Sequence, residues 1–114
     1  MSDVQDLAKR TCQECLPGSV HLEEAEAAGL GRAVSPGWER EGSLRIRRRF
    51  RFANFRDAFA LATKVALLAE SQGHHPDLEV GWGRLVVTLT THAAGGLTEN
   101  DFIMAAKIDG FAPA

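Results

Sequence analysis

The sequence lacks the features that mark membrane, secreted and nucleic-acid-binding proteins. No apolar run approaches the roughly 20 residues that a transmembrane helix needs. The first ten residues, MSDVQDLAKR, lack the apolar core of a secretory signal. The formal net charge is only -2, so the overall field favours neither nucleic acid nor an anionic membrane surface. These absences predict a cytoplasmic protein with no nucleic-acid or membrane partner.

Cysteine is scarce as well. The chain has two, Cys12 and Cys15, too few for a disulfide-framed secreted domain and typical of a reducing compartment. Their CQEC motif has no second CxxC to complete a four-thiolate zinc site, and it does not clearly lie between a strand and a helix, as a thioredoxin-like motif would. We therefore expect reduced thiols and no metal or other cofactor. A structural metal held by the two cysteines with outside ligands is the weaker alternative.

What the chain does contain is the composition of one ordinary globular domain. It has 114 residues, of which 45% are hydrophobic and 25% charged, and typical domains span about 50 to 250 residues. Residues 1–20 show no periodic apolar pattern and include Pro17 and Gly18. We therefore predict an N-terminal arm over residues 1–20 and a single domain over residues 21–114.

Strands are predicted where apolar and charged residues alternate. In SLRIRRRFRF, residues 43–52, the even positions are apolar except for Arg48, and the odd positions after Ser43 are arginines. WERE, residues 38–41, is the predicted hairpin partner, and a second hairpin is predicted over LEVGW and RLVVTLTTH. The arginines could form a strip that binds nucleic acid. Because four of the five alternate on one face and the net charge is acidic, a solvated sheet surface is the favoured interpretation.

Three helices are predicted around these hairpins. They cover residues 21–34, 54–72 and 99–111, and the second has apolar residues at three- and four-residue spacing. Gly73 suits the position after that helix, and Thr98 with Asp101 suits a capping box before the last one. Since no regular βαβ repeat occurs, the pattern predicts an α+β fold, a four-stranded antiparallel sheet with three helices packed on one face.

Three of the four histidines, His74, His75 and His92, fall in one stretch of 19 residues from 74 to 92. Imidazole has a reference pKa of ~6.5, so it can give or take a proton near neutral pH. His74 and His75 are adjacent and their side chains leave the backbone in different directions, so we expect different roles. Taken alone, the pair could be a polar exit loop without chemistry, and His92 a solvent-facing strand end. Proton transfer is the alternative interpretation.

That pattern consists of Glu70, His74-His75-Pro76, Trp82, His92 and Asp101, and it resembles the pterin-4a-carbinolamine dehydratases. The resemblance extends from about Trp38 to Ile108. It implies a small α+β protein, a homodimer or homotetramer, that acts as a hydro-lyase. The reaction would remove water from a 4a-hydroxytetrahydropterin to give quinonoid dihydropterin in tetrahydropterin recycling, without a cofactor.

The resemblance also implies a set of site residues. His74, His75, His92 and Asp101 would be catalytic, and Glu70 and Trp82 would bind the substrate. The sequence departs from the common family pattern at Leu78, where many members have tryptophan, and at Trp82, where many have tyrosine. An alternative function on the same fold is a non-catalytic dimerisation cofactor or assembly chaperone. Retention of the histidines and the acidic residue favours the enzyme.

Overall fold

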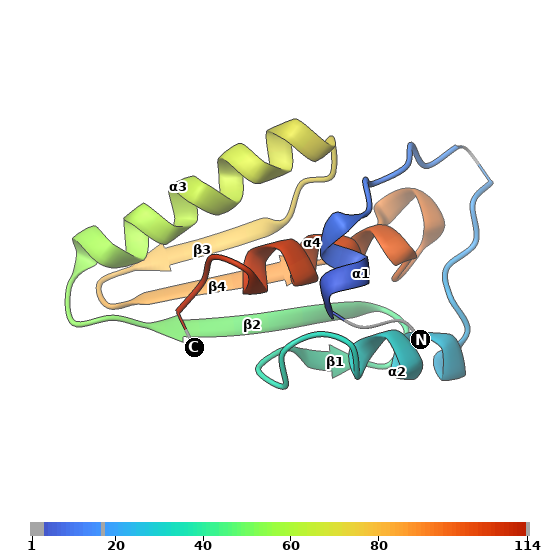
Figure 1. Ribbon diagram of the computed structural model, residues 1–114, viewed down its shortest axis with the longest axis horizontal. Helices are drawn as coiled ribbons and strands as arrows, with labels where there is room; N and C mark the ends of the chain where they lie inside the picture. Colours follow the sequence, from blue (N-terminus) through green and yellow to red (C-terminus); the bar gives the residue numbers. More distant parts are fainter. Residues whose placement is uncertain (1–3, 17, 114) are drawn as a thin grey trace.

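The alternating segments form one antiparallel sheet of four strands in the order β1-β2-β4-β3 (Figure 1). The computed structural model describes residues 4–16 and 18–113. Its strands are β1 Glu39–Glu41, β2 Arg45–Arg51, β3 Asp77–Gly81 and β4 Arg84–Leu89. The hairpins β1-β2 and β3-β4 are joined through antiparallel pairing of β2 with β4. Both predicted hairpins and the antiparallel sheet are confirmed.

The sheet has two unlike faces. The inner face carries buried apolar side chains, namely Ile46, Phe50, Leu85, Val87 and Leu89. The outer face carries the alternating arginines of β2, and acidic residues lie among them. Ion pairs there join Arg45 to Glu41, Arg49 to Glu39 and Arg84 to Glu79. Such interleaved charges are typical of a solvated surface and support that interpretation of the arginines.

Helices cover the inner face. The three predicted helices are α2 Glu24–Gly31, α3 Phe55–Gln72 and α4 Glu99–Asp109. Asn54 caps α3 by accepting a hydrogen bond from the Asp57 amide, and α4 is buried along nearly its whole length. No helix in the described part of the chain is both long enough and apolar enough to cross a membrane.

The N-terminal segment is more ordered than its sequence suggests. Residues Val4–Lys9 form a short helix, α1, which packs against α4 and buries Leu7 completely. Lys107 Nζ donates to the Ala8 carbonyl at 2.6 Å. The predicted arm therefore contains a packed helix that its sequence did not indicate. Residues 1–3 and 17 of the predicted arm lie outside the described residues, and the domain boundary at residue 20 stays a prediction.

Arg48, the exception to the alternation, lies on the inner face. Its guanidinium forms an ion pair with Asp109, and both side chains are about nine-tenths buried. Asp109 also accepts hydrogen bonds from Trp38 Nε1 and the Ser35 amide, each at 2.8 Å, and the guanidinium lies over the Phe50 ring. The charge at an apolar position is thus paired and hydrogen-bonded, as burial requires. This cluster ties the end of α4 to the middle of β2.

Candidate active site

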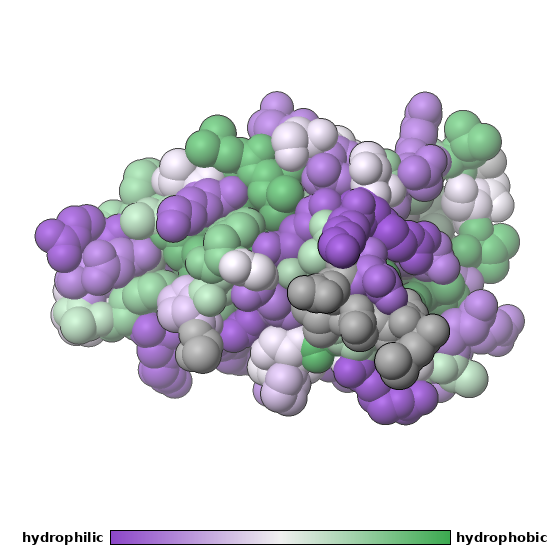
Figure 2. Space-filling view, viewed as in Figure 1, coloured by the Kyte–Doolittle hydropathy of each residue, from purple (hydrophilic) through white to green (hydrophobic). Residues whose placement is uncertain are grey.

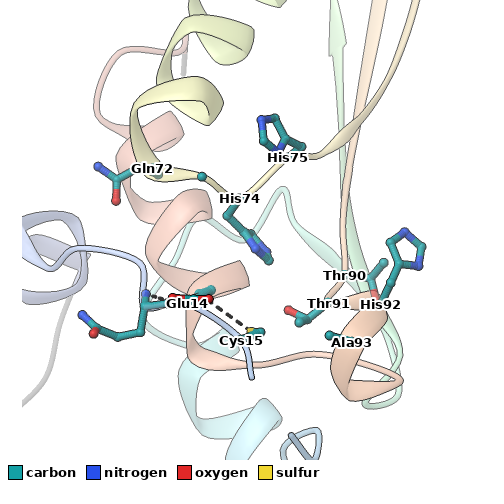
Figure 3. Close-up of a pocket in the computed structure, with 12 residues that line it drawn as sticks. Glu14, Cys15, Gln72, His74, His75, Thr90, Thr91, His92 and Ala93 are labelled. Carbon is teal, nitrogen blue, oxygen red and sulfur yellow. Dashed lines mark hydrogen bonds between the residues drawn. The ribbon is translucent and has the colours of Figure 1, made fainter. Parts of the chain in front are cut away.

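A pocket of about 560 Å³ opens where three segments of the chain meet (Figure 3). The exit loop of α3 contributes residues 72–75, and the end of β4 with the following turn contributes residues 90–93. The third wall is N-terminal, from Gln13 to Cys15, together with Asn100 of α4. The pocket therefore brings together segments that are far apart in the sequence.

His74 reaches into this pocket from the end of α3. Gly73 ends the helix in the left-handed conformation, with φ of 65°, and both its amide and that of His74 donate to the Ala69 carbonyl. The predicted role of Gly73 is confirmed. The turn directs the imidazole inward, where Nε2 lies 2.6 Å from Asp101 Oδ1. The side chain of His74 is only 11% exposed. Figure 3 shows the ring pointing into the space between Cys15 and Thr91.

Asp101 is completely buried, and its carboxylate has three partners. Besides the imidazole of His74, it binds the Thr91 hydroxyl at 2.8 Å and the Thr98 amide at 3.0 Å. The last contact is half of the predicted capping box, which is present in full at the start of α4. The carboxylate is thus held by hydrogen bonds and by the positive end of the helix dipole.

These contacts also determine the tautomer of His74. A carboxylate oxygen can only accept, so His74 Nε2 must carry the proton that is shared with Asp101. In the neutral ring, Nδ1 then has a free lone pair. His74 is therefore arranged as a proton acceptor with a fixed orientation.

His75 has a carboxylate partner too, but at the surface. Its Nε2 lies 2.7 Å from Glu70 Oε2, one turn back along the end of α3, and the two side chains are 59% and 77% exposed. Figure 3 shows the His75 ring at the rim of the pocket, pointing away from Thr91 and Cys15. Glu70 touches the site only through this histidine.

His92 lies on the opposite rim. The sequence predicted a strand as far as this residue, but β4 ends at Leu89 and His92 begins a short 3-10 helix, η1 His92–Ala94. Thr91 and Gly96 close this turn by exchanging backbone hydrogen bonds. His92 is exposed and lines the pocket beside Thr91.

Trp82 is not brought to the pocket. It lies in the turn between β3 and β4, at the end of this hairpin far from His75 and Thr90, and 72% of it is exposed. Within one chain, Trp82 therefore cannot bind a substrate in this pocket, as the resemblance implied. Leu78, the other departure from the family pattern, is half-buried and packs against the core from β3.

The sequence did not reveal the N-terminal wall. Cys12 and Cys15 both contact Asn100, with each sulfur 3.6 Å from its nearest polar atom there. Burial raises the pKa of the Cys12 thiol to about 11, so this thiol is a poor nucleophile. Both cysteines are free, and no group of three or more His, Cys, Asp or Glu side chains that could hold a metal occurs in residues 4–16 and 18–113.

Comparisons with known proteins agree with this geometry. The family model of the pterin 4 alpha carbinolamine dehydratases matches residues 20–111. Relatives provisionally named pterin-4-alpha-carbinolamine dehydratase occur in Rubrobacter xylanophilus and Aromatoleum aromaticum, each 45% identical. The first match covers 93% of this chain and 98% of the relative, and the second covers 99% of each.

A solved structure is similar as well. The crystal structure of a transcriptional coactivator/pterin dehydratase from Brucella melitensis superposes with a TM-score of 0.74 at 38% identity, over 82% of this chain and 99% of that one. The match of the family model and the coverage of these relatives agree with the resemblance seen in the histidine pattern. The chain therefore belongs to the pterin 4 alpha carbinolamine dehydratase family.

Proposed function

We propose that this protein catalyses the dehydration of 4a-hydroxytetrahydropterin to quinonoid dihydropterin, with release of water. The observation that carries the proposal is His74, whose orientation is fixed by the buried Asp101 at the wall of an open pocket. The names of the relatives point to the same reaction. The protein would act as a hydro-lyase in tetrahydropterin recycling.

The reaction needs two proton transfers. The C4a–O bond breaks as a proton reaches the leaving hydroxyl, and the C4a–N5 double bond forms as N5 loses its proton. Imidazoles can perform both steps near neutral pH. His74 Nδ1, with its free lone pair, suits the acceptance of the N5 proton. His92, across the pocket, is then the candidate donor to the hydroxyl, and His75 would orient the substrate at the rim.

A stopped-flow assay with chemically generated 4a-hydroxytetrahydropterin tests this proposal directly. The purified protein should accelerate formation of the quinonoid product, and the acceleration should survive a chelator because the proposed steps use only side chains. An unchanged rate of dehydration in the presence of the protein would contradict the function. Loss of activity on chelation that added metal restores would contradict the mechanism by histidines alone.

We also propose that the protein is a homo-oligomer, and α3 offers the surface for it. The buried residues of α3 face the sheet, but Phe55, Phe59 and Leu67 are 48%, 55% and 67% exposed. The rings of Phe55 and Phe59 stack with centroids 5.9 Å apart. Figure 2 shows hydrophobic side chains over part of α3, with hydrophilic ones between them. Exposed apolar patches of this kind often mark contacts with another chain.

Light scattering tests the oligomer, and a monomer at micromolar concentration would contradict it. Phe59→Glu should shift the protein towards a smaller species, whereas Glu79→Gln on the outer face of the sheet should not.

The Brucella relative, described as a transcriptional coactivator/pterin dehydratase, makes a coactivator role the second candidate. Oligomer formation without dehydratase activity would favour that role. The two free cysteines support a cytoplasmic location.

A further inference from the structure

Residues 12–15, which we call the strap, include the N-terminal wall of the pocket, residues 13–15, and are held by hydrogen bonds to two side chains. The Asn100 side chain binds both backbone polar groups of Gln13, accepting from its backbone N–H at 2.9 Å and donating to its backbone carbonyl at 2.6 Å. Gln72 Oε1 accepts from the Cys12 amide at 2.9 Å. Because Asn100 is only 6% exposed, these bonds compete little with water. These hydrogen bonds therefore hold the strap in a defined position at the pocket.

Asn100 and Gln72, the two residues that bind the strap, lie close in sequence to the catalytic candidates. Asn100 directly precedes Asp101 in α4, and Gln72 is the last residue of α3, two positions before His74. The strap is thus bound to the end of α3 and the start of α4, which also hold His74 and Asp101. Figure 3 shows Cys15 across the pocket from Thr91 and His92.

Glu14 is the group on the strap that lacks a partner. It is the one acidic residue that lines the pocket. The other carboxylates near the pocket are engaged, since Asp101 binds His74, Glu70 binds His75 and Glu99 binds Arg10. Among the described residues, Glu14 makes no ion pair or side-chain hydrogen bond. The pocket therefore presents a charged acceptor without a partner in the described part of the chain.

We propose that Glu14 recognises the pyrimidine edge of the pterin, and the inference rests on the proposed function. In the 2-amino-4-oxo ring, N3–H and the 2-amino group are adjacent donors that lie in one plane, as in a guanidinium. A carboxylate accepts from such a pair through both oxygens. Glu14 is a specificity-determining residue that selects pteridines with a 2-amino group.

The position of the strap fits this role. In the pterin, C2 lies across the pyrimidine ring from C4a, the carbon that loses the hydroxyl. An anchor at the C2 edge therefore leaves C4a and N5 directed away from the strap, towards the histidine walls. Binding at one end of the ring thereby orients the bonds that react at the other end.

Two measurements on Glu14→Gln test the inference. In the dehydration assay, we expect KM to rise about tenfold with little change in kcat, since charge-assisted hydrogen bonds that act equally in the ground and transition states are lost. In binding measured by fluorescence, wild-type protein should prefer pterin over lumazine, its 2-oxo analogue, by about tenfold, or ~1.4 kcal/mol. The variant should lose this preference, because its amide can donate to the 2-oxo group and accept from N3–H.

Glu79→Gln, on the outer face of the sheet, is the matched control and should retain both KM and the preference for pterin. Thermal unfolding of both variants should match that of the wild type, since Glu14 is exposed. Unchanged KM and unchanged preference in Glu14→Gln, with wild-type dehydration intact, would overturn the inference alone. Pterin binding that depends on Glu14 in a protein that does not accelerate dehydration would support the inference and overturn the proposed reaction.

Discussion

The adjacent histidines form two pairs that are similar in distance and opposite in surroundings. His74 Nε2 lies 2.6 Å from Asp101, and His75 Nε2 lies 2.7 Å from Glu70. In the first pair the imidazole is 11% exposed and the carboxylate is fully buried. In the second, both side chains are more than half exposed. The distance alone therefore does not distinguish the proposed catalytic pair from the surface pair.

The difference lies in what else holds each carboxylate. Asp101 is fixed by Thr91, by Thr98 and by the start of α4, so it can impose one orientation on His74. Among the described residues, Glu70 has no partner besides His75, and exposed ion pairs of this kind contribute a median of about 0–1 kcal/mol. Burial and additional hydrogen bonds thus give one histidine–carboxylate pair a fixed orientation that the exposed pair lacks.

The largest effect should come from His74→Ala. Loss of a general acid or base typically lowers turnover by about 10²- to 10⁴-fold, and we expect kcat to fall within this range. Binding of a product-like dihydropterin should weaken much less, because the strap and both rims remain. Stopped-flow rates and fluorescence titration measure the two quantities. A folded variant with the wild-type rate would show that this imidazole is not catalytic.

Asp101→Asn should have the next largest effect, on both activity and stability. The amide keeps the shape of the side chain but replaces one acceptor oxygen with a donor, which leaves one buried donor unsatisfied at a cost of about 1–3 kcal/mol. We expect a loss in kcat of about 10- to 100-fold as the orientation of His74 relaxes. Urea denaturation and steady-state kinetics provide the readouts. Unchanged stability would mean that the carboxylate is not the hub of this network.

His75→Ala should have a milder effect than either change. An exposed side chain that orients the substrate contributes to binding, so we expect KM to rise by less than about tenfold with kcat largely kept. The comparison with His74→Ala in the same assay is the control. Equal losses of kcat in the two variants would remove the distinction between the buried and the exposed pair.

Glu70→Gln should have the smallest effect. The amide can still accept from His75, and the exposed pair contributes little, so the free energy of unfolding should change by less than about 0.5 kcal/mol. Kinetic constants should stay within about twofold of the wild type at neutral pH. A large loss of activity would mean that Glu70 acts on the substrate itself, as the family resemblance predicts.

Much of the fold was predictable because its signals are local. Alternation located the strands, helical spacing located α3, and Thr98 with Asp101 predicted the start of α4. Arg48 broke the pattern for a reason that no local window contains, since its partner Asp109 is 61 residues away. The short helix α1 was missed because six residues carry little pattern and depend on packing against α4 for their stability.

The site was predictable only in part. The spacing of the histidines and Asp101 indicated the catalytic candidates, and the structure brings His74, His75 and His92 to one pocket. The strap could not be found, because its contacts with Asn100 span 87 residues and rest on amide groups rather than on a motif. Trp82 was assigned by resemblance, and its position at the far end of a hairpin is set by the register of β3 with β4.

Helix α4 is anchored by a carboxylate near each end, Asp101 towards the pocket and Asp109 towards the middle of β2. Asp109 lies eight positions after Asp101, about 12 Å along an α-helix. Both ends of the helix are thus fixed to other elements. A displacement at one end is expected to shift the whole helix along its axis and so to move the other end. We therefore expect a substitution at Arg48, which does not line the pocket, to alter turnover by moving the carboxylate that orients His74.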